Sequence, residues 1–183
     1  MDAFGVLGLE RRLAISEEAL RTAYDKGCRE AHPDAGGDPG EFQTLGTAFR
    51  LLLSPGQRLS HWLELEGEAM KGAGELPEVL LSLFGNLGAV FKKADELVAR
   101  REQARSRLAQ SLAERDALAA VKELEEGGAA ITALRSEYES RFLRFDREGA
   151  ASCREEAAEA ARALRFLEKW QGQLRERFVR LAG

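Results

Sequence analysis

The chain has 183 residues, a formal net charge of −4 and 32% charged residues, so its length allows one or two small domains and its acidic balance argues against a general nucleic-acid-binding protein. No apolar run approaches the roughly 20 residues of a membrane span, and the N-terminus lacks a basic region followed by an apolar core. Two cysteines without metal-knuckle spacing or a disulfide framework suit a reducing cytoplasm, so we expect a cytoplasmic protein with no nucleic-acid or membrane partner.

The first predicted elements are a short helix and a longer amphipathic one. Asp2–Leu9 is apolar and favours a one- or two-turn helix. In Glu17–Ala31 the apolar residues share one half of the helical wheel, with Ser16 as N-cap. That half carries Ala19, Leu20, Ala23, Tyr24, Gly27 and Ala31, with Cys28 at its edge. The opposite half carries three cations, Arg21, Lys26 and Arg29.

The tripeptide His32-Pro33-Asp34 follows this helix and precedes a second one. Pro33 disfavours helical backbone at His32, so the first helix should end there. Asp38 can cap the next helix and Pro39 suits its first position. Its apolar face carries Phe42, Leu45, Ala48, Phe49 and Leu52. Two helices joined by a short loop should pack antiparallel, which would expose His32 and Asp34 at the tip.

A further helix and a linker follow. Ser54 and Pro55 give the start signal of a helix that should run to about Leu65, with Leu59, Trp62 and Leu63 available for burial. Gly67–Glu75 has three glycines and no hydrophobic period, which is typical of a linker.

The sequence of the C-terminal half predicts an antiparallel helical bundle or a long helical hairpin. Val79–Val98 is dense in large apolar residues, and Ala94–Glu126 is charged and helical with a thin apolar stripe. We expect Gly127-Gly128 to form a turn, the next helix to end at Gly149, and Ser152 to cap the last helix. The chain shows no strand with convincing alternation, so the predicted class is all-α.

The order of helix, His-Pro-Asp, glycine-rich turn and helix resembles the J-domain of co-chaperones. Further likeness narrows to the HscB/Jac-type co-chaperones of iron–sulfur cluster assembly: the opening Asp2–Leu9, the stretch Ala48–Leu52 followed by Ser54-Pro55 and Arg58, and Ala163–Lys169 near the end. The resemblance implies a J-domain at 1–66, made of an antiparallel helix pair with short flanking helices, a linker at 67–76 and a client-binding helical bundle at 77–183.

The resemblance also implies a function. The J-domain would bind an HscA/DnaK-type ATPase chaperone and stimulate its ATP hydrolysis, and the bundle would deliver a client, in this family the scaffold protein IscU. The implied chaperone-binding residues are His32, Pro33, Asp34, Arg29, Lys26 and Arg21. Two departures from the family are Ala31, where J-domains usually carry tyrosine, and Ala35, where a lysine usually follows the aspartate.

Other interpretations stay open at this point. The client-binding candidates Leu80, Leu83, Phe84, Leu87 and Phe91 can equally be bundle core. Cys28 and His32 have the i, i+4 spacing of two metal ligands but lack supporting ligands, so we expect no metal and no cofactor. With no set of nucleophile, base and orienting group, we expect no catalysis. The competing function is a helical adapter with a degenerate J-like domain, and weak self-association also stays open.

Overall fold

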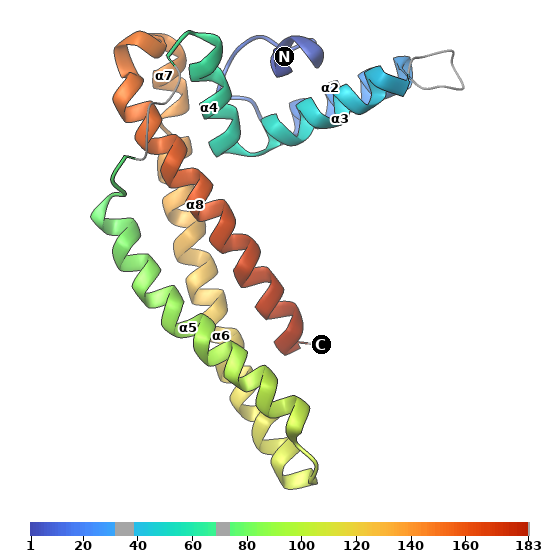
Figure 1. Cartoon of the computed structure of the whole chain (residues 1–183), viewed down its shortest axis with the longest axis vertical. Coiled ribbons are helices and arrows are strands. Elements are labelled where there is room, and N and C mark those ends of the chain that lie inside the picture. The colour runs from blue at the N-terminus through green and yellow to red at the C-terminus, as the bar shows by residue number, and fades with distance from the viewer. Residues whose placement is uncertain (32–38, 69–73, 183) are drawn as a thin grey trace. The chain divides into compact units, whose positions relative to one another are not determined.

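The computed structural model describes residues 1–31, 39–68 and 74–182. Within these ranges all regular elements are helices and no strand occurs, which confirms the all-α class (Figure 1). The helices are α1 (Ala3–Val6), α2 (Glu17–Glu30), α3 (Pro39–Leu53), α4 (Pro55–Leu65), α5 (Glu78–Gln103), α6 (Arg107–Glu139), α7 (Phe142–Glu148) and α8 (Ala150–Ala182). No helix of the described ranges has both the length and the apolar character needed to cross a bilayer.

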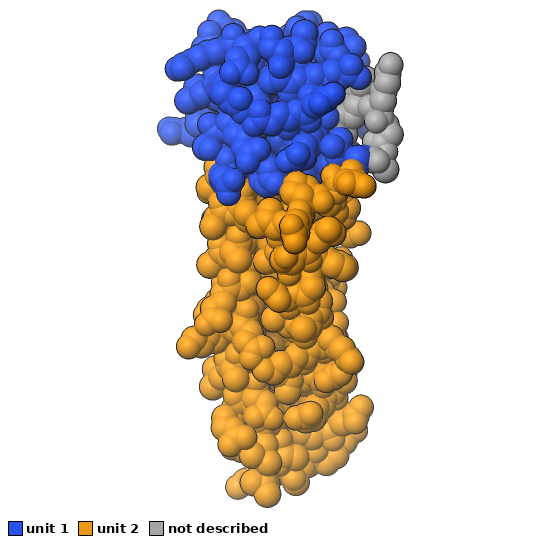
Figure 2. All heavy atoms as spheres, turned by 90° about the vertical axis from the view of Figure 1, so that its left-hand side faces the viewer, with its two compact units in different colours: residues 1–74, 137–165 blue, residues 75–136, 166–183 orange. Residues whose placement is uncertain are grey.

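The chain forms two compact units, coloured separately in Figure 2. Unit 1 comprises residues 1–74 and 137–165, and unit 2 comprises residues 75–136 and 166–183. The sequence predicts a single division of the chain, at the glycine-rich segment. In the structure, residues 137–165 instead belong to the same compact unit as the first four helices. Helices α6 and α8 therefore each contribute residues to both units.

In unit 1, α2 and α3 form the predicted antiparallel pair. The rings of Tyr24 and Phe49 stack with centroids 4.5 Å apart, and a Cβ on Gly27 would lie 2.8 Å from Leu45. Tyr24 contacts Phe49, whereas the later α2 residue Gly27 contacts the earlier α3 residue Leu45, so the two helices run in opposite directions. Leu20, Leu45, Ala48 and Leu52 are buried, as expected for the facing sides. Phe42, predicted for the same face, is 39% exposed because it lies at the first turns of α3.

The predicted N-caps Ser16 and Ser54 are confirmed, while the predicted cap Asp38 lies outside the described residues. The Ser16 hydroxyl accepts a hydrogen bond from the Ala19 amide, and the Ser54 hydroxyl accepts one from the Gln57 amide. Pro55 occupies the first turn of α4, and Pro39 opens α3. These signals act within four residues, so sequence alone is enough to locate them.

Unit 2 is a bundle of α5, most of α6 and the C-terminal part of α8, in which α6 runs antiparallel to α5. Ion pairs join Lys93 to Glu123 and Arg100 to Asp116, an order that makes α5 and α6 antiparallel. Arg177 of α8 binds Asp95 of α5 at 2.9 Å, and Arg101 donates to the Leu181 carbonyl at 2.9 Å, so α5 and α8 run parallel. The buried core includes Leu80, Leu87, Phe91, Leu97, Leu124, Ile131, Leu167 and Trp170.

The predicted turn at Gly127-Gly128 is wrong, because α6 passes through both glycines without interruption. A Cβ on Gly127 would lie 2.8 Å from Leu87 of α5 and 3.5 Å from Leu174 of α8. A Cβ on Gly128 would also meet Leu174, at 3.7 Å. The two glycines therefore allow neighbouring helices to approach closely, a role that a sequence pattern does not distinguish from a turn.

The chain breaks elsewhere instead. Ser106 caps α6 by accepting a hydrogen bond from the Ala109 amide, after a turn at 104–106. Gly149 ends α7 as predicted, with a left-handed φ of 77°. The last helix already begins at Ala150, so Ser152 lies inside it, and the backbone leaves helical geometry at the following residue, Cys153.

Candidate functional site

The candidate site of unit 1 is the cationic face of α2. Arg21, Lys26 and Arg29 are exposed, as the helical period predicts. Arg21 is held by Glu17 of the preceding turn, with Nε donating to the carboxylate at 2.9 Å. Because the opposite side of α2 packs on α3, the three cations lie on a helix whose position is fixed by its own core.

The tripeptide His32-Pro33-Asp34 lies outside the described residues, and so does Ala35. The structure does describe both flanks. Helix α2 ends at Glu30, and the Ala31 amide donates to the Gly27 carbonyl at 2.9 Å as the C-cap. The predicted stop before His32 is thus confirmed, while the predicted exposure of His32 and Asp34 stays a prediction.

Helix α1 is attached to α4 through a buried histidine. His61 Nε2 accepts a hydrogen bond from the Ala3 amide at 3.1 Å, and its ring stacks on Phe4. The acceptor role assigns the proton of a neutral imidazole to Nδ1, which lies 3.7 Å from the Glu64 carboxylate. Sequence reasoning missed this contact because its partners are 58 residues apart.

A second attachment joins the connector before α2 to α7. The Asp146 carboxylate accepts hydrogen bonds from the Leu13 amide at 2.7 Å and from the Ala14 amide at 3.0 Å. Arg58 of α4 donates to the Ile15 carbonyl at 3.1 Å, and its guanidinium lies over the Phe142 ring. No local signal reveals these contacts, because Asp146 and Leu13 are separated by 133 residues.

The five client-binding candidates of α5 do not form one surface. Leu80, Leu87 and Phe91 are buried in the core of unit 2 and Leu83 is partly buried, so exposure singles out Phe84. Arg177 closes over Phe91, with its guanidinium 4.5 Å from the ring centroid. In this structure Leu80, Leu87 and Phe91 therefore belong to the core of unit 2.

Phe84 instead belongs to a different exposed group, which we call the aromatic face: Leu81, Phe84 and Phe166, in which the buried Trp170 contacts the Phe84 and Phe166 rings. Leu81 is 54% exposed, Phe84 57% and Phe166 37%. The Phe84 and Phe166 rings lie 5.5 Å and 5.9 Å from Trp170. Gly85 and Gly88 share the Leu81 side of α5, and a Cβ on either would meet nothing within 4 Å. The sequence could not identify this face because it combines α5 with α8.

The two thiols are candidate metal ligands, Cys28 together with His32, and His32 lies outside the described residues. Among the described residues, no group of three or more His, Cys, Asp or Glu side chains could hold a metal ion. Cys153 is buried, its thiol donates to the Gly149 carbonyl, and burial raises its pKa. Both effects keep this thiol protonated and unreactive.

Comparisons of sequence place the similarity in the J-domain class. No family model matches the chain. It is 30% identical over 94 residues to chaperone protein DnaJ 1 of Nocardia farcinica, which covers 50% of this chain and 23% of the relative. It is 34% identical over 94 residues to chaperone protein dnaJ 2 of Arabidopsis thaliana, covering 48% and 22%. The chain thus spans less than a quarter of these relatives.

Comparisons of structure extend over the whole chain. Chaperone HscB from Vibrio cholerae matches with a TM-score of 0.59 and 17% identity, covering 96% of both chains. Human co-chaperone protein HscB matches with a TM-score of 0.58 and 16% identity, covering 96% of this chain and 81% of the other. At this identity the match shows the fold, and it confirms the resemblance to the HscB type that the sequence motifs indicate.

Proposed function

We propose that this chain, which has the fold of HscB, is a J-domain co-chaperone that stimulates the ATPase of a DnaK/HscA-type chaperone. The observation that carries the proposal is the antiparallel pair α2 and α3, with three cations on the outer side of α2. The pair flanks His32-Pro33-Asp34 in the sequence, and the DnaJ similarity supports the same interpretation.

The proposed mechanism is docking. Arg21, Lys26 and Arg29 attract an acidic surface of the chaperone, which raises the association rate and makes it sensitive to salt. His32 and Asp34 then supply directional hydrogen bonds, and Pro33 restricts the loop so that less conformational entropy is lost on binding. With Asp25 among the cations and alanine at position 35, the electrostatic attraction is expected to be modest.

The test is the steady-state ATPase rate of the chaperone with increasing amounts of this protein. Wild type should stimulate, His32→Gln should abolish stimulation, and Arg29→Ala should weaken it, less so as salt rises. Arg107→Ala, an exposed arginine of α6 in unit 2, is the matched control and should behave as wild type. Equal stimulation by wild type and His32→Gln would reject the co-chaperone function.

We further propose that unit 2 binds the client, with an IscU-type scaffold as the candidate, through the aromatic face. The face offers three exposed apolar side chains next to bare backbone at Gly85 and Gly88, where a partner can approach closely. Phe84→Ser and Leu81→Ser should weaken binding of the scaffold protein in a titration. Leu118→Ser, a 72% exposed leucine of α6, is the control. Identical binding by all four proteins would reject the aromatic face.

One observation favours a second function, a helical adapter whose J-like domain does not stimulate an ATPase. Ala31 is 5% exposed and caps α2, so the position before His32 serves the helix end and presents no ring to a partner. The ATPase titration separates the two functions. A chain that binds the scaffold protein but leaves the chaperone rate unchanged would be the adapter.

A further inference from the structure

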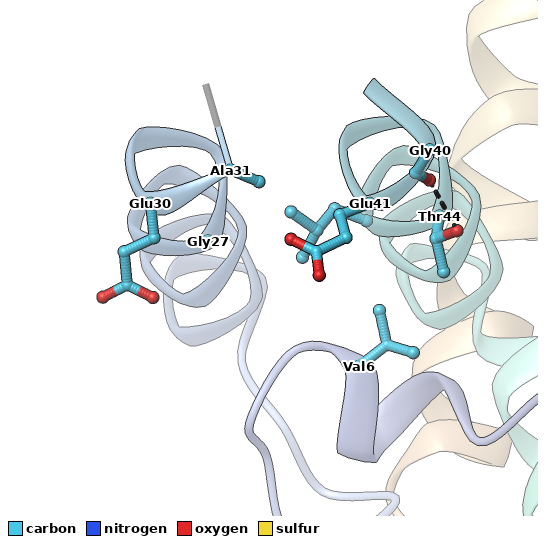
Figure 3. Close-up of a pocket in the computed structure, with 8 residues that line it drawn as sticks. Val6, Gly27, Glu30, Ala31, Gly40, Glu41 and Thr44 are labelled. Atoms are coloured by element: carbon cyan, nitrogen blue, oxygen red, sulfur yellow. Dashed lines mark hydrogen bonds between the residues drawn. The ribbon is translucent and has the colours of Figure 1, made fainter. Parts of the chain in front are cut away.

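A cavity opens between α2 and α3 on the side that faces α1. Its volume is about 610 Å³, and the described residues that line it belong to unit 1. Figure 3 shows the Val6 side chain of α1 pointing toward α3 and Glu41 extending from α3 toward α2. The cavity is separate from the outer cationic face, because Arg21, Lys26 and Arg29 do not line it.

Small residues create this space. Gly27 and Ala31 of α2 and Gly40 of α3 line the cavity, so side chains that would otherwise fill the gap end at Cα or Cβ. A Cβ at Gly27 would lie 2.8 Å from the end of the Leu45 side chain, so α2 and α3 pack closely one turn below Ala31. Ala31 matters most, since a tyrosine at this position, which the family resemblance leads one to expect, would add a ring at the cavity wall.

The chemistry of the lining is uneven. Val6, Ala31 and Leu45 supply an apolar floor. Among the described residues of the lining, the charged groups are two carboxylates, Glu30 from α2 and Glu41 from α3. The Thr44 hydroxyl already donates to the Gly40 carbonyl at 2.8 Å. An apolar floor with carboxylates at its edge suits a lysine or arginine side chain, whose aliphatic stem covers apolar surface while its charged end reaches acceptors.

We infer that this cavity receives a cationic side chain of the partner chaperone, an inference that rests on the proposed co-chaperone function. Unit 1 then presents two opposite charges to one partner: cations on the outer side of α2 and carboxylates at the cavity. A partner must offer an acidic surface and a protruding cation at the matching distance. Such a charge pattern fixes the orientation of docking and rejects partners that carry only one of the two features.

The experiment is the same ATPase titration, read as the concentration that gives half-maximal stimulation. Ala31→Tyr fills the cavity, and the double variant Glu30→Gln/Glu41→Gln removes its charge without changing its shape. Each should raise the half-maximal concentration by roughly tenfold, which corresponds to about 1.4 kcal/mol. The charge variant should also flatten the salt dependence. Ala31→Ser, which leaves the cavity open, and Glu18→Gln, an exposed carboxylate elsewhere on α2, should behave as wild type.

The outcomes separate this inference from the function on which it rests. If His32→Gln abolishes stimulation while the charge variant matches wild type, the cavity does not bind a cation and the co-chaperone function stands. If Ala31→Tyr alone loses stimulation while its melting temperature is unchanged, the cavity accepts a neutral group instead, and the inference is again overturned. If wild type and His32→Gln stimulate equally, the function itself is rejected and the cavity inference with it.

Discussion

The Asp146 carboxylate ties the connector before α2 to α7. Its carboxylate accepts hydrogen bonds from two consecutive amides, those of Leu13 and Ala14, and the Leu13 side chain is fully buried. Since α2 starts three residues after Ala14, at Glu17, this contact fixes the position of the first turn of α2 relative to α7. The exposure of the three cations could be predicted from the helical period. The hydrogen bonds between Asp146 and the connector could not, because Asp146 and Leu13 are far apart in the sequence.

Asp146→Ala should therefore destabilise the protein. Two amides lose their acceptor, and a lost charge-assisted hydrogen bond at a partly buried site costs about 1–3 kcal/mol of unfolding free energy. Urea denaturation followed by circular dichroism measures the change. Asp25→Ala, an exposed carboxylate of α2, should stay within about 0.5 kcal/mol of wild type. A similar loss in both variants would contradict the anchoring role.

The two cysteines should differ in reactivity. Cys153 is 5% exposed, its thiol is hydrogen-bonded to the Gly149 carbonyl and its pKa is raised by burial, whereas Cys28 is partly exposed on α2. A thiol-reactive disulfide reagent should therefore modify one thiol quickly, and Cys28→Ser should remove that fast phase. The second thiol should react only under unfolding conditions. A fast phase that survives in Cys28→Ser would show that Cys153 is accessible.

At the scale of the helices, the sequence predicts the ends that depend on local caps, but it does not predict the role of glycines that lie against a distant helix. Caps such as Ser16 and Ser54 act locally, so the ends of α2 and α4 follow from the sequence. Gly127 and Gly128 read as a turn because nothing in the sequence shows that Leu87 and Leu174 lie against them. The aromatic face was missed for the same reason, since it depends on which turns of α5 and α8 are neighbours.

Gly56 in α4 is the sharpest test of this kind. A Cβ there would lie 2.8 Å from the backbone nitrogen of Arg165 and 3.2 Å from the Ala161 carbonyl oxygen, and backbone cannot yield as a side-chain end can. Gly56→Ala should lower the unfolding free energy by about 1–3 kcal/mol through overpacking. Gly172→Ala in α8, where a Cβ meets nothing within 4 Å, should instead raise it by roughly 0.5–1 kcal/mol through helix propensity. Equal effects in thermal melts would refute the close approach.

At the scale of the whole molecule, the N-terminal helices complete their compact unit only with residues 137–165. The sequence predicts a boundary near residue 66 because the following segment is rich in glycine and lacks a hydrophobic period. It does not show that Phe142 lies under Arg58 or that Asp146 binds the connector.

A fragment that ends at residue 74 should accordingly be less stable than unit 1 in the whole chain. It lacks the Asp146 acceptor and the Phe142 ring, and a loss of about 2 kcal/mol lowers the melting temperature of a domain this size by roughly 10 °C. The comparison uses amide NMR signals of α2 and α3, followed with temperature in the fragment and in the full chain. Identical melting in both would show that residues 1–74 fold alone.

The division of unit 1 into two sequence segments has a consequence for synthesis on the ribosome. Helices α1–α4 emerge first, but the residues that complete their packing emerge only after unit 2's α5 and most of α6 have been made. Until residue 165 has left the exit tunnel, the nascent chain carries an N-terminal region whose docking surface for α7 is still bare. The N-terminal region can complete its packing only after the intervening residues and residues 137–165 have been made, so it stays incompletely packed during their synthesis and open to binding by chaperones.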